Sequence, residues 1–284
     1  MTAYEIRIQH LDLAQTLGCG QTFRWKPLVD GSWKGPLGDQ LITLSRSTQG
    51  LRIEAVPGGR RAVDLVTAHI RAADDIPAIQ RMLSKDPVIA KGAPEVRGLR
   101  IVKIDEWECL VSFMLATYAN IPRISKMIET LADRYGEEIA EGVHTFPSIE
   151  RMNSVSEREL ANCGLGYRAK YVHEVSRVVD PDSLSMSKKL NYTDLRERLK
   201  GLPGVGDKVA DCVCLFGFGR LESFPIDVWI ERALARLYHK RGTYKMLREF
   251  ASQRFGQYAG YAQEYLYYNE RAHAPDGSCV FSQG

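Results

Sequence analysis

The segment LKGLPGVGDKVADCVCLFGFGRLESFPIDVWIER, residues Leu199–Arg232, decides the fold of this chain. Within it, Leu202–Gly206 (LPGVG) forms a glycine-rich turn between two stretches with helical periodicity. Glycine permits left-handed backbone and close approach of other groups. The helix after the turn presents unpaired N–H groups at the positive end of its dipole. The turn can therefore hold a phosphate through backbone donors, and a cation through outward carbonyls. The alternative is a simple connection between two helices, and the turn alone leaves both open.

Two ionisable residues on the helices that follow suggest chemistry. Lys208 lies two residues after the turn, and Asp227 follows Ile226 at the start of a third helix. An amine must be neutral to act as a nucleophile, whereas free lysine, with a pKa of ~10.4, is only about 0.1% neutral near pH 7.4. Burial and nearby positive charge lower that pKa. A carboxylate at a helix N-terminus stays ionised and can stabilise a developing oxocarbenium ion. In the alternative interpretation, Lys208 grips a phosphate and Asp227 only caps its helix.

With Pro225–Val228 (PIDV) after Leu202–Cys212, the segment resembles the helix-hairpin-helix plus Gly/Pro-Asp motif of base-excision DNA glycosylases. The run Lys208–Cys212 (KVADC) is similar to 8-oxoguanine DNA glycosylases in particular. In that family the lysine attacks the sugar carbon C1′ and the aspartate assists, so the resemblance assigns these roles to Lys208 and Asp227. It also implies that the hairpin binds a DNA phosphate 3′ of the lesion, with Gly204, Gly206 and Val209 in contact with DNA. The resemblance further implies a monovalent cation, Na⁺ or K⁺, held by the backbone carbonyls of Lys200, Leu202 and Val205, and no required cofactor.

Composition and cysteine spacing limit the class of protein. The 284 residues fit one large domain or two to three small ones, and an apolar content of 44% supports a core. The net charge of +3 leaves room for a basic cleft without demonstrating nucleic-acid binding. The six cysteines form no C-x-x-C pair, which argues against zinc and an iron–sulfur cluster and favours a reduced, intracellular protein. The sequence shows no targeting signal and no apolar run long enough to span a bilayer, so we expect no membrane partner, and we expect a monomer.

The hydrophobic pattern predicts an α+β fold. Residues 1–103 are expected to form an antiparallel sheet domain with flanking helices, residues 104–273 a helical helix-hairpin-helix domain, and residues 274–284 a polar tail. Short strands are predicted at Leu11–Leu17, Thr22–Trp25, Gln40–Ser45 and Leu51–Val56. After the strands, the spacing of apolar residues changes towards a period of 3.6, which predicts helices near Val63–Ile70 and Pro77–Leu83. Lys85–Gly98 is expected to be irregular.

In the second domain the same period predicts four long helices, at Asp105–Tyr118, Pro122–Tyr135, Tyr167–Val179 and Phe255–Arg271. Ser156–Glu159 fits a capping box, whose helix is expected to stop at Gly164. Thr193 is expected to cap the first helix of the hairpin.

Other segments match the same family and define an expected base pocket. Gly20–Trp25 (GQTFRW) matches the N-terminal signature, in which the glycine carbonyl accepts from N7–H of the oxidised base. Guanine has a lone pair at N7, so it would leave this acceptor unsatisfied at a cost of about 1–3 kcal/mol. Gln263 matches the glutamine that bonds the Watson–Crick edge, and Tyr267, one turn later on the same face, matches the aromatic that stacks on the base. Cys212 matches the residue that packs on the other face of the base. If the resemblance is set aside, Gly20 is interpreted as an ordinary turn glycine. The aromatic residues at helical spacing around Tyr267 are then interpreted as core residues.

Basic and aromatic residues elsewhere are expected to contact DNA. In Gly164–Tyr171 (GLGYRAKY), Tyr167 matches a tyrosine that wedges into the duplex and Arg168 an arginine that reads the orphaned cytosine. A helix cap followed by a solvated helix face is the alternative. Arg123 matches a second cytosine reader. Two positions depart from the family. Tyr118 stands where a void-filling asparagine is usual, so strictness for cytosine opposite the lesion is not implied, and Trp229 replaces a common phosphate-contacting histidine.

The sequence therefore predicts a bifunctional DNA glycosylase and AP lyase that removes 8-oxoguanine, opposite cytosine, from double-stranded DNA. The nucleotide must leave the stack because its glycosidic bond is unreachable inside the duplex. Lys208 then forms a Schiff base with the sugar. Two alternatives stay open. A monofunctional glycosylase for alkylated purines would not need Lys208, and a non-enzymatic helix-hairpin-helix module would not explain Asp227 or the Gln263 pocket.

Overall fold

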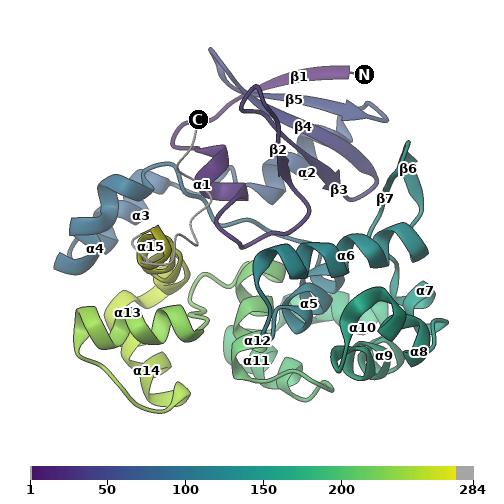
Figure 1. Ribbon diagram of the computed structural model, residues 1–284. Coiled ribbons are helices and arrows are strands. Elements are labelled where there is room, and N and C mark those ends of the chain that lie inside the picture. Colours follow the sequence, from purple (N-terminus) through teal and green to yellow (C-terminus); the bar gives the residue numbers. More distant parts are fainter. Residues whose placement is uncertain (1, 273–284) are drawn as a thin grey trace.

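The computed structural model describes residues 2–272, and its N-terminal part is a five-stranded antiparallel sheet in the order β1-β5-β4-β3-β2 (Figure 1). The strands are β1 (Thr2–Arg7), β2 (Lys26–Pro27), β3 (Trp33–Leu37), β4 (Gln40–Ser47) and β5 (Gly50–Val56). Alternate residues of the central strands, among them Ile42, Leu44 and Ile53, are fully buried, because successive side chains of a strand point to opposite faces. Helix α2 (Arg61–His69) packs against β5.

The remainder of the described chain is mostly helical. The helices are α1 (Leu13–Leu17), α3 (Ile76–Leu83), α4 (Pro87–Gly92), α5 (Glu106–Leu115), α6 (Ile121–Tyr135), α7 (Ile149–Asn153), α8 (Glu157–Leu160), α9 (Arg168–Val178), α10 (Pro181–Met186), α11 (Tyr192–Lys200), α12 (Asp207–Cys212), α13 (Val228–Tyr238), α14 (Tyr244–Phe255) and α15 (Ala259–Ala272). A small hairpin of β6 (Glu138–Ala140) and β7 (Val143–His144) follows α6. Helix α12 continues into a π-helical turn over Val213–Gly217.

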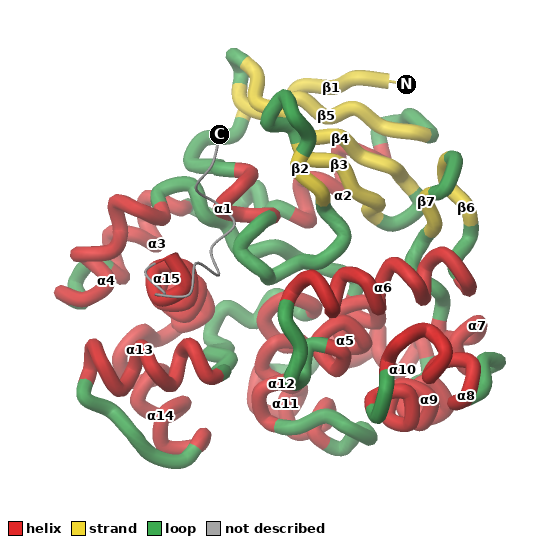
Figure 2. The backbone as a smooth tube through the Cα atoms, viewed as in Figure 1, coloured by secondary structure: helices red, strands yellow, loops and turns green. Residues whose placement is uncertain are grey.

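The helices form two groups beneath the sheet, as Figures 1 and 2 show. Helices α5 to α12 lie on one side, and α13 to α15 lie with α3 and α4 on the other. Helix α15, at the end of the described chain, packs against α4 from the N-terminal part as well as against α13 and α14. Helix α5 is buried from Cys109 to Leu115, so it forms the centre of its group.

The predicted α+β class is confirmed, but two predicted N-terminal strands are wrong. Most of Leu11–Leu17 is helix α1, because Asp12 caps the helix by accepting from the Gln15 N–H at 3.0 Å. Thr22–Trp25 is a loop. Phe23 and Trp25 are both buried, so this loop is held by tertiary packing of its side chains and not by a strand partner. Strand β1 was not predicted.

Three helix predictions also need correction. Lys85–Gly98 contains α4, whose cap Asp86 accepts two backbone N–H bonds. Asn191, and not Thr193, caps α11, because its Oδ1 accepts from the Asp194 N–H at 3.0 Å. The long helix predicted at Phe255–Arg271 is interrupted, since Gly256 takes a φ of +57° between α14 and α15.

The capping box at Ser156 is confirmed, with both reciprocal hydrogen bonds to Glu159 present. Gly164 adopts a φ of +82° near the end of that helical segment. The predicted tail over 274–284 lies outside the described residues. We propose to keep the domain division near residue 103, because residues 99–104 form an irregular connection between the N-terminal part and α5.

Candidate active site

The hairpin predicted at Leu202–Gly206 joins α11 to α12. Gly204 has a φ of +75°, and a Cβ added there would lie 2.7 Å from the Cβ of Tyr171. Both backbone shape and available space therefore require glycine at this position. Gly206 precedes α12 and has no side chain to cap it, so the first N–H groups of that helix receive no side-chain acceptor from the cap position. The turn is thereby suited to hold an anion through its backbone.

The proposed cation ligands are carbonyls of the same turn. The Leu202 carbonyl accepts from the Val205 N–H at 3.2 Å, and a carbonyl oxygen has a second lone pair for another partner. The Lys200 ammonium forms an ion pair with Asp207 at 3.1 Å. The Lys200 side chain is therefore directed to that carboxylate, and the candidate cation ligand of this residue is its backbone carbonyl. Within residues 2–272, no three His, Cys, Asp or Glu side chains cluster as metal ligands. Over the same range, every helix is too short or too polar to cross a bilayer.

A buried network beneath the hairpin fixes the position of α12. Asp211 is fully buried, and its Oδ1 accepts from Nε of Arg196 at 3.0 Å. Its Oδ2 accepts from the Tyr244 hydroxyl at 2.7 Å, and that hydroxyl oxygen accepts from the Ile226 N–H at 3.2 Å. The network thus connects the helix that carries Lys208 to the residue that precedes Asp227. Sequence reasoning did not find these partners, although an aspartate on an apolar helix face was a signal that buried donors exist.

Lys208 lies against an apolar aromatic wall. It is half-buried, and its Nζ lies 5.1 Å from the ring centroid of Phe113, within the range of a cation–π contact. Phe113 stacks on Phe216 with centroids 5.2 Å apart and meets the edge of Phe23 at 5.7 Å. The amine also lies near the thiol of Cys212, one helical turn away. Burial raises the pKa of that thiol to about 12, although the nearby amine acts to lower it, so the thiol stays protonated beside the lysine.

Asp227 caps α13 with one of its two carboxylate oxygens. Oδ1 accepts from the N–H groups of Trp229 at 3.0 Å and Ile230 at 2.9 Å. Within residues 2–272, Oδ2 receives no hydrogen bond. Burial raises the pKa of Glu264 and of Tyr267, and the Asp227 charge adds to both increases. The carboxylate therefore acts electrostatically on residues of α15.

Residues of the predicted base pocket come from the Gly20 loop and from α15, which meet at the contact between Cys19 and Glu264. Gly20 has a φ of +106°, which strains any larger residue, and an added Cβ would lie 2.6 Å from Cδ1 of Ile121, which would have to move. Gln263 is 5% exposed, and its Oε1 has no hydrogen-bond partner within residues 2–272. A buried polar atom without a partner requires an explanation, and a bound ligand is one. Tyr267 lies half-buried one turn further along α15.

Gln21 anchors the loop that presents Gly20. Its Nε2 donates to the carbonyls of Thr16 and Arg100, both at 2.7 Å, and its Oε1 accepts from the Val102 N–H at 3.0 Å. These bonds tie the loop to the connection that precedes α5. The sequence signature containing Gln21 was recognised, but this anchoring role was not predicted.

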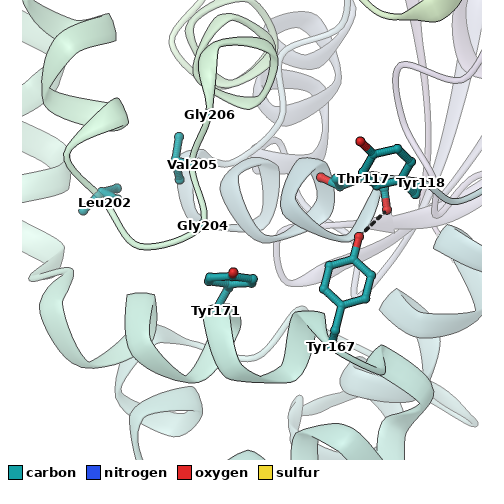
Figure 3. A pocket seen from close by; sticks show the side chains of 8 residues that line it. All are labelled: Thr117, Tyr118, Tyr167, Tyr171, Leu202, Gly204, Val205 and Gly206. Carbon is teal, nitrogen blue, oxygen red and sulfur yellow. Dashed lines mark hydrogen bonds between the residues drawn. The ribbon is translucent and has the colours of Figure 1, made fainter.

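Aromatic rings line a hollow of about 730 Å³ next to the hairpin (Figure 3). Tyr118 is 93% exposed and has a φ of +51°, and Tyr167 is 56% exposed. The Tyr167 hydroxyl donates to the Thr117 carbonyl at 3.2 Å, and Tyr171 lies between Tyr167 and the turn (Figure 3). Exposed aromatic faces beside a turn suited to hold an anion are also suited to the stacking of nucleic-acid bases.

The other predicted DNA contacts differ in exposure. Arg168 is 3% exposed and its Nε donates to the Thr117 carbonyl at 3.0 Å, so reading a base requires it to leave this contact. Arg123 is exposed in the first turn of α6. Val209 is buried, so only its backbone can reach DNA, and Trp229 is half-buried in the first turn of α13.

Two protein-family models match this chain. The N-terminal domain of 8-oxoguanine DNA glycosylase matches residues 3–110, and the HhH-GPD superfamily base excision DNA repair protein matches residues 111–257. The N-glycosylase/DNA lyase OGG1 of Arabidopsis thaliana is 30% identical over 94% of this chain and 80% of that protein. A probable N-glycosylase/DNA lyase of Methanothermobacter thermautotrophicus is 34% identical over 62% of this chain and 64% of that protein.

A solved structure is similar over nearly the whole chain. It is the Clostridium acetobutylicum 8-oxoguanine glycosylase/lyase in complex with double-stranded DNA containing cytosine opposite 8-oxoguanine. The two chains share 28% identity with a TM-score of 0.88, over 93% of this chain and 92% of that chain.

Proposed function

Because the chain belongs to the 8-oxoguanine DNA glycosylase family of HhH-GPD base-excision repair proteins, we propose that it removes 8-oxoguanine opposite cytosine from duplex DNA and then cleaves the abasic site. The observation that carries the proposal is that three features lie at and around Asp227, whose charge acts on the Cys212 thiol near Lys208 and on Glu264, the neighbour of Gln263 on α15. These are the Lys208 amine, the uncommitted oxygen of Asp227, and the buried, unpaired amide oxygen of Gln263. The substrate is cellular DNA, so we propose that the enzyme acts inside the cell, as a single chain.

Binding would proceed through the hairpin and the exposed tyrosines. The backbone at Gly204 and Gly206 holds a phosphate, with a monovalent cation at the neighbouring carbonyls to offset its charge. Tyr118 and Tyr167 stack in the space vacated by the flipped nucleotide. The flipped base then lies between Cys212 and Tyr267, with its N7–H on the Gly20 carbonyl and its Watson–Crick edge on Gln263.

The chemistry would start at the Lys208 amine. Its unprotonated lone pair attacks C1′, the glycosidic bond breaks, and the base leaves with the bonding electrons and takes up a proton. Opening of the sugar ring gives a protonated Schiff base between Lys208 and C1′. Loss of a proton from C2′ then expels the 3′ phosphate and nicks the strand. Asp227 Oδ2 stabilises the positive charge that develops on the sugar as the glycosidic bond breaks.

Borohydride trapping on a duplex with one 8-oxoguanine opposite cytosine tests this proposal. Borohydride reduces a Schiff base to a stable amine, so wild-type protein should become covalently attached to DNA. Lys208→Gln should abolish the adduct while retaining binding, and Asp227→Asn should slow base release. The charge-stabilising role predicts a loss of roughly 100-fold or more.

The same experiment separates the alternatives. Base release without any adduct would identify a water-using glycosylase. Strong binding unaffected by Asp227→Asn, with neither adduct nor release on any oxidised or alkylated purine, would leave only a DNA-binding module.

A further inference from the structure

A cation from the last turn of α15 contacts residues of the predicted base pocket. Gln263, Tyr267 and Arg271 are spaced four residues apart, so they lie on one face of α15. Nη1 of Arg271 donates to the Cys19 carbonyl at 3.0 Å and lies 3.5 Å from the Tyr267 hydroxyl. The guanidinium carbon lies 5.5 Å from the centroid of the Tyr267 ring. Arg271 therefore connects the ring proposed to stack on the base with the loop that carries Gly20.

The guanidinium also approaches Gly20 itself. A Cβ built on Gly20 would lie 3.4 Å from Nη1 of Arg271. Gly20 supplies the carbonyl proposed to accept from N7–H of the base. A strong hydrogen-bond donor thus lies immediately beside the proposed acceptor, at the same edge of the pocket.

Glu264, an acidic residue of the same helix, carries little negative charge at pH 7. Glu264 accepts from the Cys19 thiol at 3.6 Å, and burial raises the pKa of its carboxyl to about 8 although Arg271 opposes the increase. At pH 7 the Glu264 carboxyl is therefore mostly protonated. The Arg271 guanidinium is a charged donor, and a charged donor forms stronger hydrogen bonds than a neutral one.

The hydrogen-bonding edge of 8-oxoguanine complements this arrangement. Its N7–H donor is flanked by two carbonyl oxygens, O6 and O8. An acceptor at Gly20 with a donor next to it can pair with N7–H and with one of these oxygens at once. A guanidinium carries five N–H groups in a planar fork, so a single side chain can serve two acceptors.

Resting on the proposed function, we propose that Arg271 contacts the base, donating to the carbonyl oxygen next to N7–H while the Gly20 carbonyl accepts from N7–H. This adds a fourth side chain, from the end of α15, to the expected pocket of Cys212, Gln263 and Tyr267. The competing explanation is structural, with Arg271 only fastening α15 to the Cys19 carbonyl.

Separating base excision from abasic-site cleavage distinguishes the two explanations. Arg271→Met keeps the aliphatic stem and removes every donor. Single-turnover rates are measured on 8-oxoguanine opposite cytosine and on the same duplex with a preformed abasic site, which contains no base to contact. The loss of one charged hydrogen bond predicts that base excision falls about 10- to 100-fold, while abasic-site cleavage stays within about threefold. Arg271→Lys, which retains a charged donor, should recover part of the excision rate.

A matched control and a second substrate complete the design. Arg236→Met removes another cation that touches the last turn of α15, since Arg236 pairs with Glu270, and it should leave both rates unchanged. A duplex containing 8-oxoadenine offers N7–H and O8 but an amino group in place of O6. If Arg271→Met slows only 8-oxoguanine excision, the contact is to O6, and if it slows both lesions equally, the contact is to O8.

The proposal is overturned if Arg271→Met leaves excision of 8-oxoguanine unchanged, or lowers excision and abasic-site cleavage by the same factor. The second outcome would establish the structural explanation, and thermal melting of the variant would show its cost to the fold. Failure of the wild-type protein to release 8-oxoguanine would instead reject the proposed function, independently of Arg271.

Discussion

Replacing Tyr244 by phenylalanine tests whether the buried network holds the lysine helix and the aspartate segment in register. The change removes one oxygen. That oxygen donates to Asp211 at 2.7 Å and accepts from the Ile226 N–H at 3.2 Å. Burial, followed by the Asp211 charge, raises the pKa of the Tyr244 hydroxyl well above its usual value, so it acts as a neutral donor at any physiological pH.

The structure sets the size of the expected loss. A hydrogen bond to a charged group contributes about 1.5–3 kcal/mol, and a buried N–H left unsatisfied costs about 1–3 kcal/mol. Asp211 keeps its bonds from Arg196 and Tyr192, which limits the damage. We therefore expect the free energy of unfolding to fall by about 2–4 kcal/mol, and Tm to fall by roughly 3–7 °C for a chain of this size.

Urea unfolding and borohydride trapping measure the two consequences. The urea midpoint should fall with an unchanged slope, and adduct formation should slow because Lys208 and Asp227 lose their shared anchor. Tyr258→Phe is the matched control. It removes the same atom from a half-buried tyrosine whose hydroxyl makes no hydrogen bond within residues 2–272, so it should change neither quantity. If Tyr244→Phe behaves like Tyr258→Phe in both assays, the network does not couple the two residues and the reasoning fails.

Three further predictions address other parts of the site. Gly204→Ala should lower stability by at least about 1–2 kcal/mol because of left-handed backbone strain, and the clash with Tyr171 adds to this loss. The variant should also weaken DNA binding. Thermal melting measures the first effect and fluorescence anisotropy the second. Tyr118→Asn should leave stability unchanged or slightly higher, because asparagine tolerates the φ of +51° better. The same change should weaken duplex binding about 10- to 100-fold, because stacking is lost. Equal binding by the variant and the wild type would reject the stacking role. The folded protein retains the Glu264 proton up to a pH of about 8, whereas an unfolded glutamate releases its proton near 4.5. The free energy of unfolding should therefore decrease as pH rises between these values, by up to about 1.4 kcal/mol per pH unit. Urea titrations at about pH 5.5, 6.5 and 7.5 measure this slope, and Glu264→Gln should remove it.

The fold could be predicted where local pattern and packing agree. Alternation in Leu51–Val56 and the helical period of Pro122–Tyr135 both persist in the structure, as β5 and α6. The loop Thr22–Trp25 misled the prediction because its apolar side chains are buried by distant residues, such as Phe113 beside Phe23. Helix α4 was missed although Asp86 and Pro87 are a cap followed by a favoured first residue.

The site could be predicted from motifs, but its supports could not. Lys208, Asp227, Gly20 and Gln263 were identified by resemblance to a family, which carries roles without carrying contacts. The Phe113 ring behind Lys208 comes from α5, far from the hairpin in sequence. No periodicity of α15 could indicate that a cation in its last turn meets a carbonyl near the start of the chain. These are contacts between distant segments, and only the folded chain reveals them.

The alternative interpretations left open for Asp227 are compatible in the folded chain. A carboxylate has two oxygens, and the N-terminus of α13 uses only Oδ1. Capping fixes the rotation of the side chain. Oδ2 is then held in one orientation, which is the condition for stabilising a cationic sugar without reorganisation. Helix capping therefore does not compete with the proposed catalytic role of Asp227. It supplies the orientation that the role requires, and Asp227→Asn, which can still cap through its amide oxygen, removes the charge alone.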